Sequence, residues 1–262
     1  MRLLRQELKI NRKTFMIWLL CIAFCSVGCI VLYHSLEDSV KELADSYSNM
    51  GAMSQAIGMD KLSLATMEGY YGTEIAIVFN LGVAMFAALI GIGMLSKEEN
   101  GHTAEFLNAL PVSRVQIYFE KYAGLLIMIV LFNLIQVVLN YITIVWMNQM
   151  FDIDIFVKYH IAAVLMQVEI ASVCYMISAI TKRTLLGAGL GFAILMFGLE
   201  MMCRIIPAIE DAKYITPFYY CNAADIFSSG KLDTTLLGIG CGVTVISIII
   251  GVLAYQKKDI AA

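Results

Sequence analysis

The sequence has 262 residues, of which 60% are hydrophobic and 15% are charged, and its formal net charge is −3. Soluble domains average about 45–50% apolar and about 25% charged residues, so this composition excludes an ordinary soluble domain. A membrane-spanning helix needs about 20 consecutive, mostly apolar residues, and several stretches reach that length. The sequence therefore predicts an all-α integral membrane protein with one transmembrane domain over residues 1–262.

The first predicted element is a short helix at residues 1–14, which mixes leucines with Arg and Lys. This pattern is typical of a helix that lies along the membrane interface. The apolar run at 15–33 is longer than the core of a signal peptide, and no small-residue cleavage site follows it. We expect this run to be an uncleaved first span.

Five further apolar runs predict spans at residues 74–95, 117–146, 161–180, 185–206 and 236–255. With the N-terminus inside, the inner segments carry about twice as many Lys and Arg residues as the outer segments. The positive-inside rule therefore places both termini in the cytoplasm.

A charged stretch, SKEENGHTAEFLNALPVSR, separates the second and third predicted spans and is too long for a simple turn. Asn100 is expected to cap the start of a short amphipathic helix, and Pro111 to end it. Such a helix buries its apolar face either in the membrane interface or in a groove of a soluble partner. The residues alone leave both possibilities open.

Several residues of this stretch occur in an order that resembles the cytoplasmic loop of ABC-2 type transporter permeases. The resemblance extends in architecture over the whole chain, and it implies that residues 97–114 form a coupling helix between spans two and three. This helix would dock on a separately encoded ATPase subunit and pass its movement to the spans. The residues implied in coupling are Glu98, Glu99, Gly101, Thr103, Glu105, Phe106, Leu107, Leu110, Pro111 and Arg114.

The same resemblance implies the permease subunit of an ABC exporter in the bacterial plasma membrane. By alternating access it would move a hydrophobic or amphipathic cargo, such as a peptide, a drug or a lipid-like molecule. Its partners would be two copies of the ATPase and a second permease, identical or homologous, with no role for nucleic acid. Sodium or other ion export by the same type of complex is an alternative, as is a membrane sensor without transport.

Catalysis is not expected in this chain. It contains no G-x-x-x-x-G-K-[ST] phosphate loop, so we expect ATP and Mg to bind to the partner subunit. Neither H-E-x-x-H nor G-x-S-x-G occurs, which argues against an intramembrane enzyme. We expect no cofactor and no metal site in the chain itself.

Polar residues inside the predicted spans are candidates for the translocation route. Glu169 lies in the middle of the fourth predicted span, where a protonated carboxyl bonded to a neighbouring helix is the alternative interpretation. Asn133, Gln136 and Asn140 share one face of the third span, and adhesion between helices is the favoured interpretation for them. Glu200 and Arg204 are four residues apart, which predicts a local ion pair.

Residues 207–233 are expected on the outer face. The resemblance implies a re-entrant or interfacial segment there, and an ordinary extracellular loop is the alternative. Its aromatic group, which includes Phe218 and Tyr220, is typical of the headgroup level. A disulfide between Cys203 and Cys221 is left open. Two small-x-x-x-small patterns, Gly187 with Gly191 and Gly238 with Gly242, favour close helix packing and a permease dimer.

Overall fold

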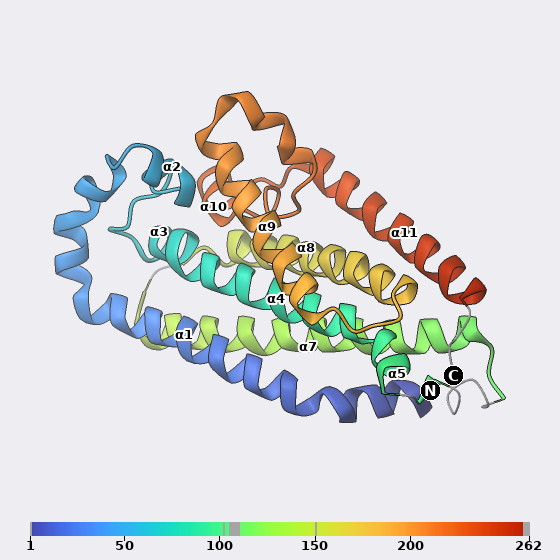
Figure 1. Ribbon diagram of the computed structural model, residues 1–262. Helices are drawn as coiled ribbons and strands as arrows, with labels where there is room; N and C mark the ends of the chain where they lie inside the picture. The colour runs from blue at the N-terminus through green and yellow to red at the C-terminus, as the bar shows by residue number, and fades with distance from the viewer. Residues whose placement is uncertain (1, 102, 105–110, 150, 259–262) are drawn as a thin grey trace.

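The computed structural model describes residues 2–101, 103–104, 111–149 and 151–258, and none of these residues forms a β-strand (Figure 1). The long helices are α1 (Arg2–Ser48), α4 (Ala76–Gly93), α7 (Arg114–Trp146), α8 (Ile153–Ile180), α9 (Leu186–Ile205) and α11 (Thr234–Lys257). The short ones are α2 (Ala52–Ile57), α3 (Met67–Tyr70), the π-helix η1 (Tyr71–Ile75), α5 (Ser96–Asn100), the 3-10 helix η2 (Pro207–Tyr214) and α10 (Ala223–Ser229).

Six helices of the described chain are long and apolar enough to cross a membrane. They are Leu3–Ser48, Met67–Gly93, Arg114–Trp146, Ile153–Ile180, Leu186–Ile205 and Thr234–Lys257. The second of these joins α3, η1 and α4 without a break. The all-helical class and the six spanning helices predicted from the sequence are therefore confirmed.

The first helix differs most from its predicted bounds. α1 runs without interruption through 47 residues, so it is about 70 Å long. The expected boundary between an interfacial helix at 1–14 and a first span at 15–33 does not exist as a break in the helix. Beyond Tyr33 the residues become polar, which ends the hydropathy signal, but no Gly or Pro interrupts the helix before Gly51, whose φ is 62°.

The start of the predicted coupling helix also differs. Asn100 does not cap a helix; it is the last residue of α5, and both Glu98 and Glu99 lie inside that helix. The expectation of an N-cap at Asn100 was therefore wrong, because Asn100 ends one short helix, Ser96–Asn100, instead of preceding one. Most of the helix that was predicted to follow it lies outside the described residues. At the other end of the stretch, the Ser113 hydroxyl accepts a hydrogen bond from the Gln116 amide at 3.2 Å and caps α7.

The centre of the bundle is formed by α4 and α8, while α1, α9 and α11 lie outside them (Figure 1). Gly91 allows the two central helices to approach closely: a Cβ atom there would lie 2.7 Å from the carbonyl oxygen of Ala171. We call the end of the bundle that holds the start of α1, α5 and the end of α11 the base, and the opposite end the apex. In Figure 1 the base lies at the lower right of the view.

At the apex, the segment between η2 and α10 enters the bundle. Phe218 and Tyr220 are 3% and 6% exposed, and Cys221 is fully buried. The side-chain amide of Asn80 in α4 donates to the carbonyl oxygen of Cys221 at 3.3 Å. These two aromatic side chains therefore pack within the protein instead of forming an exposed anchor at the headgroup level. Cys203 and Cys221 are both free thiols, so the disulfide left open by the sequence is not formed.

Candidate functional site at the base

A buried ionic cluster joins three helices at the base. Glu7 of α1 is 3% exposed and accepts hydrogen bonds from Lys97 of α5 and, at 2.6 Å, from Lys121 of α7. Lys121 is 1% exposed, and its ammonium also donates to Glu98 at 2.7 Å and to the carbonyl oxygen of Met94 at 3.1 Å. An ammonium group has three N–H donors, so all of them are used. The cluster holds α1, α5 and α7 together.

This environment shifts the pKa values of two side chains of α5, Glu98 and Lys97. Burial would by itself raise the pKa of Glu98, but the Lys121 ammonium and the Thr103 hydroxyl favour the ionised form, and the pKa lies below 4.5. Burial lowers the pKa of Lys97, and the pairing with Glu7 only partly offsets that effect. Glu98 is therefore stabilised as a carboxylate by its neighbours in the same chain.

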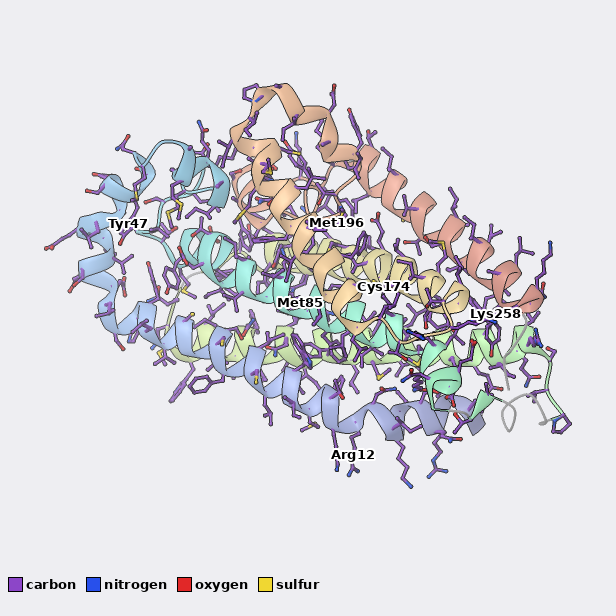
Figure 2. The ribbon with its side chains drawn as sticks, in the orientation of Figure 1. Arg12, Tyr47, Met85, Cys174, Met196 and Lys258 are labelled. Atoms are coloured by element: carbon purple, nitrogen blue, oxygen red, sulfur yellow. The ribbon has the colours of Figure 1, made fainter. Side chains whose placement is uncertain are left out.

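A second ion pair ties the same short helix to the end of the chain. Glu99 of α5 pairs with Lys258, and the two side chains are only 7% and 6% exposed. Lys258 also donates to the carbonyl oxygen of Thr181, which follows α8, at 2.6 Å. Figure 2 shows Lys258 at the base, beyond the end of α11. This contact joins α5 to the ends of α8 and α11.

The C-terminal end of the predicted coupling segment also contacts the end of α11. Arg114, the first residue of α7, donates to the backbone carbonyl oxygens of Gln256 at 3.1 Å and of Lys258 at 2.7 Å. Both flanks of segment 97–114 are thus fixed to the end of α11: Glu99 binds the Lys258 side chain, and Arg114 binds its backbone. A displacement of this segment would be transmitted to the last spanning helix.

The ten predicted coupling residues fall into three groups. Glu98, Glu99 and Arg114 face their own chain. Gly101, Thr103 and Pro111 are exposed at the base. Glu105, Phe106, Leu107 and Leu110 lie outside the described residues.

Sequence reasoning missed Glu7 and Lys258 as members of this site. Glu7 did carry a signal, because it is the only acidic residue among the first 36 and lies in a strongly basic segment. Lys258 carried none, since nothing in the sequence pairs it with a residue more than 150 positions earlier.

The polar residues of α7 that the sequence predicted as a stripe each contact a different neighbour. Asn133 donates to Gln167 of α8 at 2.5 Å. Gln136 donates to the carbonyl oxygen of Leu19 in α1 at 3.0 Å. Asn140 donates to the hydroxyl of Tyr71 in η1 at 3.1 Å. All three are at most 3% exposed. The contacts support the interpretation as adhesion between helices.

Glu169 forms a hydrogen bond with a residue of the segment that enters the bundle at the apex. It is 6% exposed, and its carboxylate accepts a hydrogen bond from the hydroxyl of Tyr220 at 2.9 Å. Gly240 of α11 lies directly against this pair, because a Cβ atom there would lie 2.5 Å from the Glu169 carboxylate. The intramembrane acid therefore links α8 to the inserted segment and to α11. Sequence reasoning singled out Glu169 but not Tyr220.

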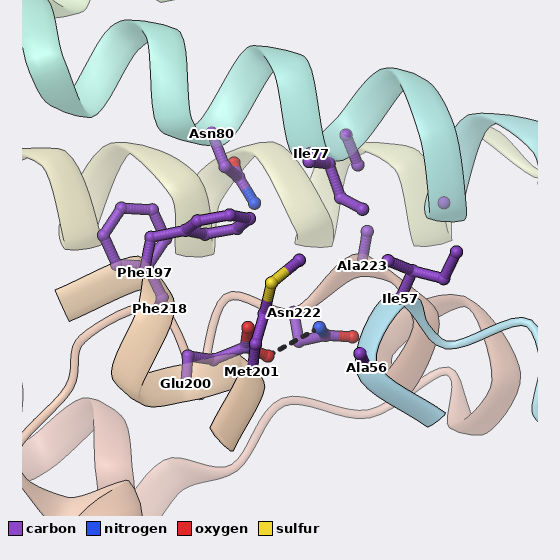
Figure 3. Close-up of a pocket in the computed structure, with 12 residues that line it drawn as sticks. Ala56, Ile57, Ile77, Asn80, Phe197, Glu200, Met201, Phe218, Asn222 and Ala223 are labelled. Carbon is purple, nitrogen blue, oxygen red and sulfur yellow. Dashed lines mark hydrogen bonds between the residues drawn. The ribbon is translucent and has the colours of Figure 1, made fainter. Parts of the chain in front are cut away.

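A further ionic cluster closes the apex. Glu200 and Arg204 form the local ion pair that their spacing predicts. Arg204 also binds Asp225 of α10 at 2.9 Å. Asn222 donates to Glu200 at 2.9 Å (Figure 3). The adjacent cavity, which Asn80 also lines, has a volume of about 20 Å³. This is room for about one water molecule, so the cavity is too small for a cargo.

Comparison with curated proteins finds no match to this chain. Among the described residues, no group of three or more His, Cys, Asp or Glu side chains could hold a metal ion. The family model of ABC-2 family transporter proteins matches residues 1–260, which is nearly the whole sequence. The six spanning helices agree with a membrane subunit of this kind. The chain belongs to the ABC-2 transporter family.

Proposed function

We propose that this chain is the permease subunit of an ATP-driven exporter for a hydrophobic or amphipathic cargo, such as a peptide, a drug or a lipid-like molecule. The observation that carries the proposal is the family match over residues 1–260. ABC-2 permeases are membrane subunits that normally work with a separate ATPase. ATP and Mg would accordingly be bound by that partner, present in two copies, while this chain supplies the path through the bacterial plasma membrane.

The distribution of positive charge supports a base that faces the cytoplasm. The described Lys and Arg residues of the base are Arg5, Lys9, Arg12, Lys13, Lys97, Arg114, Lys121, Lys182, Arg183, Lys257 and Lys258. Those of the apical side are fewer, namely Lys41, Lys61, Lys158, Arg204, Lys213 and Lys231. Cytoplasmic segments near spanning helices carry the excess of Lys and Arg. Both termini would then lie inside the cell.

Segment 97–114 would be the contact with the ATPase. Because Glu98 and Glu99 are paired within the chain, their role in this proposal is to transmit force rather than to bind the partner. The partner would contact the exposed residues Asn100, Gly101, Thr103 and Pro111, together with the residues between 105 and 110. A displacement of this surface would be transmitted to α1 and α7 through the ion pairs of Lys121 with Glu7 and Glu98. It would reach α8 and α11 through Lys258.

A second permease would pack on α9. Gly187, Gly191 and Gly198 lie four and seven residues apart on one face of this helix, and nothing lies within 4 Å of a Cβ atom at any of them. The same face exposes 68% of Leu195. Small residues allow membrane helices to approach closely, and the described part of the chain leaves these three without a neighbour. The cargo path would run between the two permeases, and Glu169 would be the route residue closest to the apical segment.

The test is a pull-down of the tagged chain from its native cells in mild detergent, with mass spectrometry of the proteins that are retained. We expect an ATPase with a phosphate loop. Asn100→Arg, which places a bulky charge on the exposed surface of α5, should lose this ATPase. The matched control is Met53→Arg at the apex, where the side chain is 59% exposed, and it should retain the ATPase.

Two results would contradict the proposal. Absence of any ATPase from the unaltered chain would favour a membrane sensor or another function without ATP-driven transport. Retention of the ATPase by Asn100→Arg would place the docking surface elsewhere on the base.

A further inference from the structure

The outward face of α1 carries an unpaired basic stripe near the base. Arg5, Lys9 and Arg12 are spaced by four and three residues, so they share one face of the helix, and Lys13 lies beside them. All four are exposed. Figure 2 shows Arg12 pointing away from the bundle. None of the four forms an ion pair with another described residue. We call Arg5, Lys9 and Arg12 the basic stripe.

The acidic residues of α1 and α5 at the base are turned away from this stripe. Glu7, on the opposite face of α1, is 3% exposed and binds Lys97 and Lys121. Glu98 and Glu99 bind Lys121 and Lys258. Within the described residues, these carboxylates neutralise buried cations and leave the exposed ones uncompensated. The stripe therefore presents a positive field to its surroundings.

The same face of α1 becomes apolar within one turn of the stripe. Met16 follows Arg12 by four residues, and Leu20 and Phe24 continue the line at 61% and 82% exposure. Exposed apolar side chains of this size on a spanning helix face lipid chains. The stripe consequently lies where the apolar part of the surface ends, at the level of the phospholipid headgroups.

We propose that the basic stripe of α1 binds anionic phospholipid headgroups in the leaflet at the base. The phosphate of an acidic lipid would supply the negative charge that no described carboxylate provides to the stripe. The acyl chains of the same lipid would lie along Met16, Leu20 and Phe24. An acidic protein surface would match the charge but not the uninterrupted apolar continuation of the same face. This inference does not depend on the ATPase, because it concerns the lipid-facing side of α1.

The experiment needs a single tryptophan beside the stripe. The chain has two tryptophans, Trp18 in α1 and Trp146 at the end of α7, and Trp18 packs against Phe86 on the side of α1 opposite the stripe. The parent is therefore the variant Met16→Trp, Trp18→Phe, Trp146→Phe, whose fluorescence comes only from position 16, a 43% exposed site one turn after Arg12. The parent is reconstituted in phosphatidylcholine bilayers that contain either brominated phosphatidylglycerol or brominated phosphatidylcholine. Quenching of this tryptophan by the two lipids gives the relative association constant of the anionic lipid at this part of α1.

We expect the parent to prefer phosphatidylglycerol by about fivefold or more, since one Lys or Arg near an anionic surface contributes roughly that factor. The triple variant Arg5→Gln, Lys9→Gln, Arg12→Gln should reduce the preference to about one. The double variant Arg5→Lys, Arg12→Lys keeps the charge and should retain it. About 1 M salt should also weaken it, because the Debye length falls to about 3 Å.

The matched control removes three other exposed cations of the base, Lys182→Gln, Arg183→Gln and Lys257→Gln, and should leave the preference unchanged. Equal losses in both triple variants would overturn the proposal, because the effect would then belong to the overall charge of the base. A relative association constant near one in the parent would overturn it as well. If the stripe variant kept its lipid preference but lost a co-purifying ATPase, the stripe would be a protein-docking surface instead.

Discussion

The pair of Glu99 and Lys258 connects a short helix in the middle of the sequence to its last described residue. Its side chains are 7% and 6% exposed, so neither charge is stabilised by bulk water when its partner is removed. Removing one partner of a buried ion pair costs about 3–5 kcal/mol. This contact therefore contributes much more to the integrity of the base than an exposed pair would.

Lys258→Met should accordingly lower the free energy of unfolding by about 3 kcal/mol, because Glu99 is left buried and unpaired. The measurement is thermal or denaturant unfolding in detergent, with hydrogen exchange of α5 as a local reading. The control is Lys41→Met, which breaks the exposed pair with Glu37 at the apex and should change stability by less than about 1 kcal/mol. Similar losses in the two variants would show that the Lys258 pair has no special role.

Glu98 should make the stability of the base dependent on pH. Its pKa in the folded state lies below 4.5, because burial is outweighed by the Lys121 ammonium, the Thr103 hydroxyl and Lys97. The folded state therefore binds this proton more weakly than the unfolded state does. The stabilisation is fully present above about pH 4.5 and is lost as pH falls through the folded-state pKa.

The comparison that isolates this effect is the unaltered chain against Glu98→Gln. Glu7 shares Lys121 with Glu98, but it is present in both proteins. The unaltered chain should be the more stable of the two at pH 6, and the difference should shrink below pH 4.5. A difference that stays constant between pH 6 and pH 3.5 would mean that Glu98 is not held as a carboxylate by these neighbours.

Individual residues were predicted with uneven success. The resemblance to ABC-2 permeases singled out Glu98 and Glu99 within the charged stretch between two spans. It could not indicate that Lys121 and Lys258 neutralise them, since this depends on how helices far apart in sequence meet at the base. Glu169 was identified by its position in a span, whereas Tyr220 was not, because its segment looked like an exposed aromatic anchor.

Among the helices, α4 and α8 depend on one glycine for their closest approach. In Gly91→Ala, the new Cβ atom would lie 2.7 Å from the backbone oxygen of Ala171, so the helices must separate. Overpacking of this kind costs about 1–3 kcal/mol. The measurement is the free energy of unfolding in detergent.

Gly198→Ala in α9 is the matched control for Gly91→Ala. No atom of the described residues lies within 4 Å of the new atom, so the gain in helix propensity should leave a monomer unchanged or stabilise it by up to about 1 kcal/mol. Destabilisation by Gly198→Ala as large as that of Gly91→Ala would argue against the tight contact at Gly91.

The existence of the six spanning helices was predictable, and their ends were not. Hydropathy detects the part of a helix that crosses the apolar core, so it identified 15–33 but not the remainder of α1. The polar continuation of that helix to Ser48 follows from helix-forming residues without an interrupting Gly or Pro. The early start of α5 at Ser96 was missed for a related reason, since Asn100 was taken for a cap.

For the whole molecule, two helix faces carry glycines without a neighbour among the described residues: α9 has Gly187, Gly191 and Gly198, and α11 has Gly238 and Gly242. Glycines that pack within the chain, such as Gly91 and Gly189, lie close to atoms of neighbouring helices. Gly187, Gly191 and Gly198 do not. The sequence pattern favoured close helix packing at Gly187 and Gly191, but it could not separate packing inside the chain from packing between chains. Within the described residues these glycines have no packing partner in their own chain, and the proposed second permease would cover them.

Gly191→Trp should therefore lower the fraction of dimers in lipid bilayers by about tenfold or more, because a large side chain prevents the close approach of two α9 helices. The measurement is single-molecule photobleaching of a labelled chain over a range of protein-to-lipid ratios. Ile246→Trp is the matched control: this side chain of α11 is 57% exposed to the surroundings, and its enlargement should leave the dimer intact. If Gly191→Trp dimerises like the unaltered chain, α9 is not the interface, and Gly187, Gly191 and Gly198 face lipid. If Ile246→Trp alone is monomeric, the second permease packs on α11 instead, and the proposed cargo path moves with it.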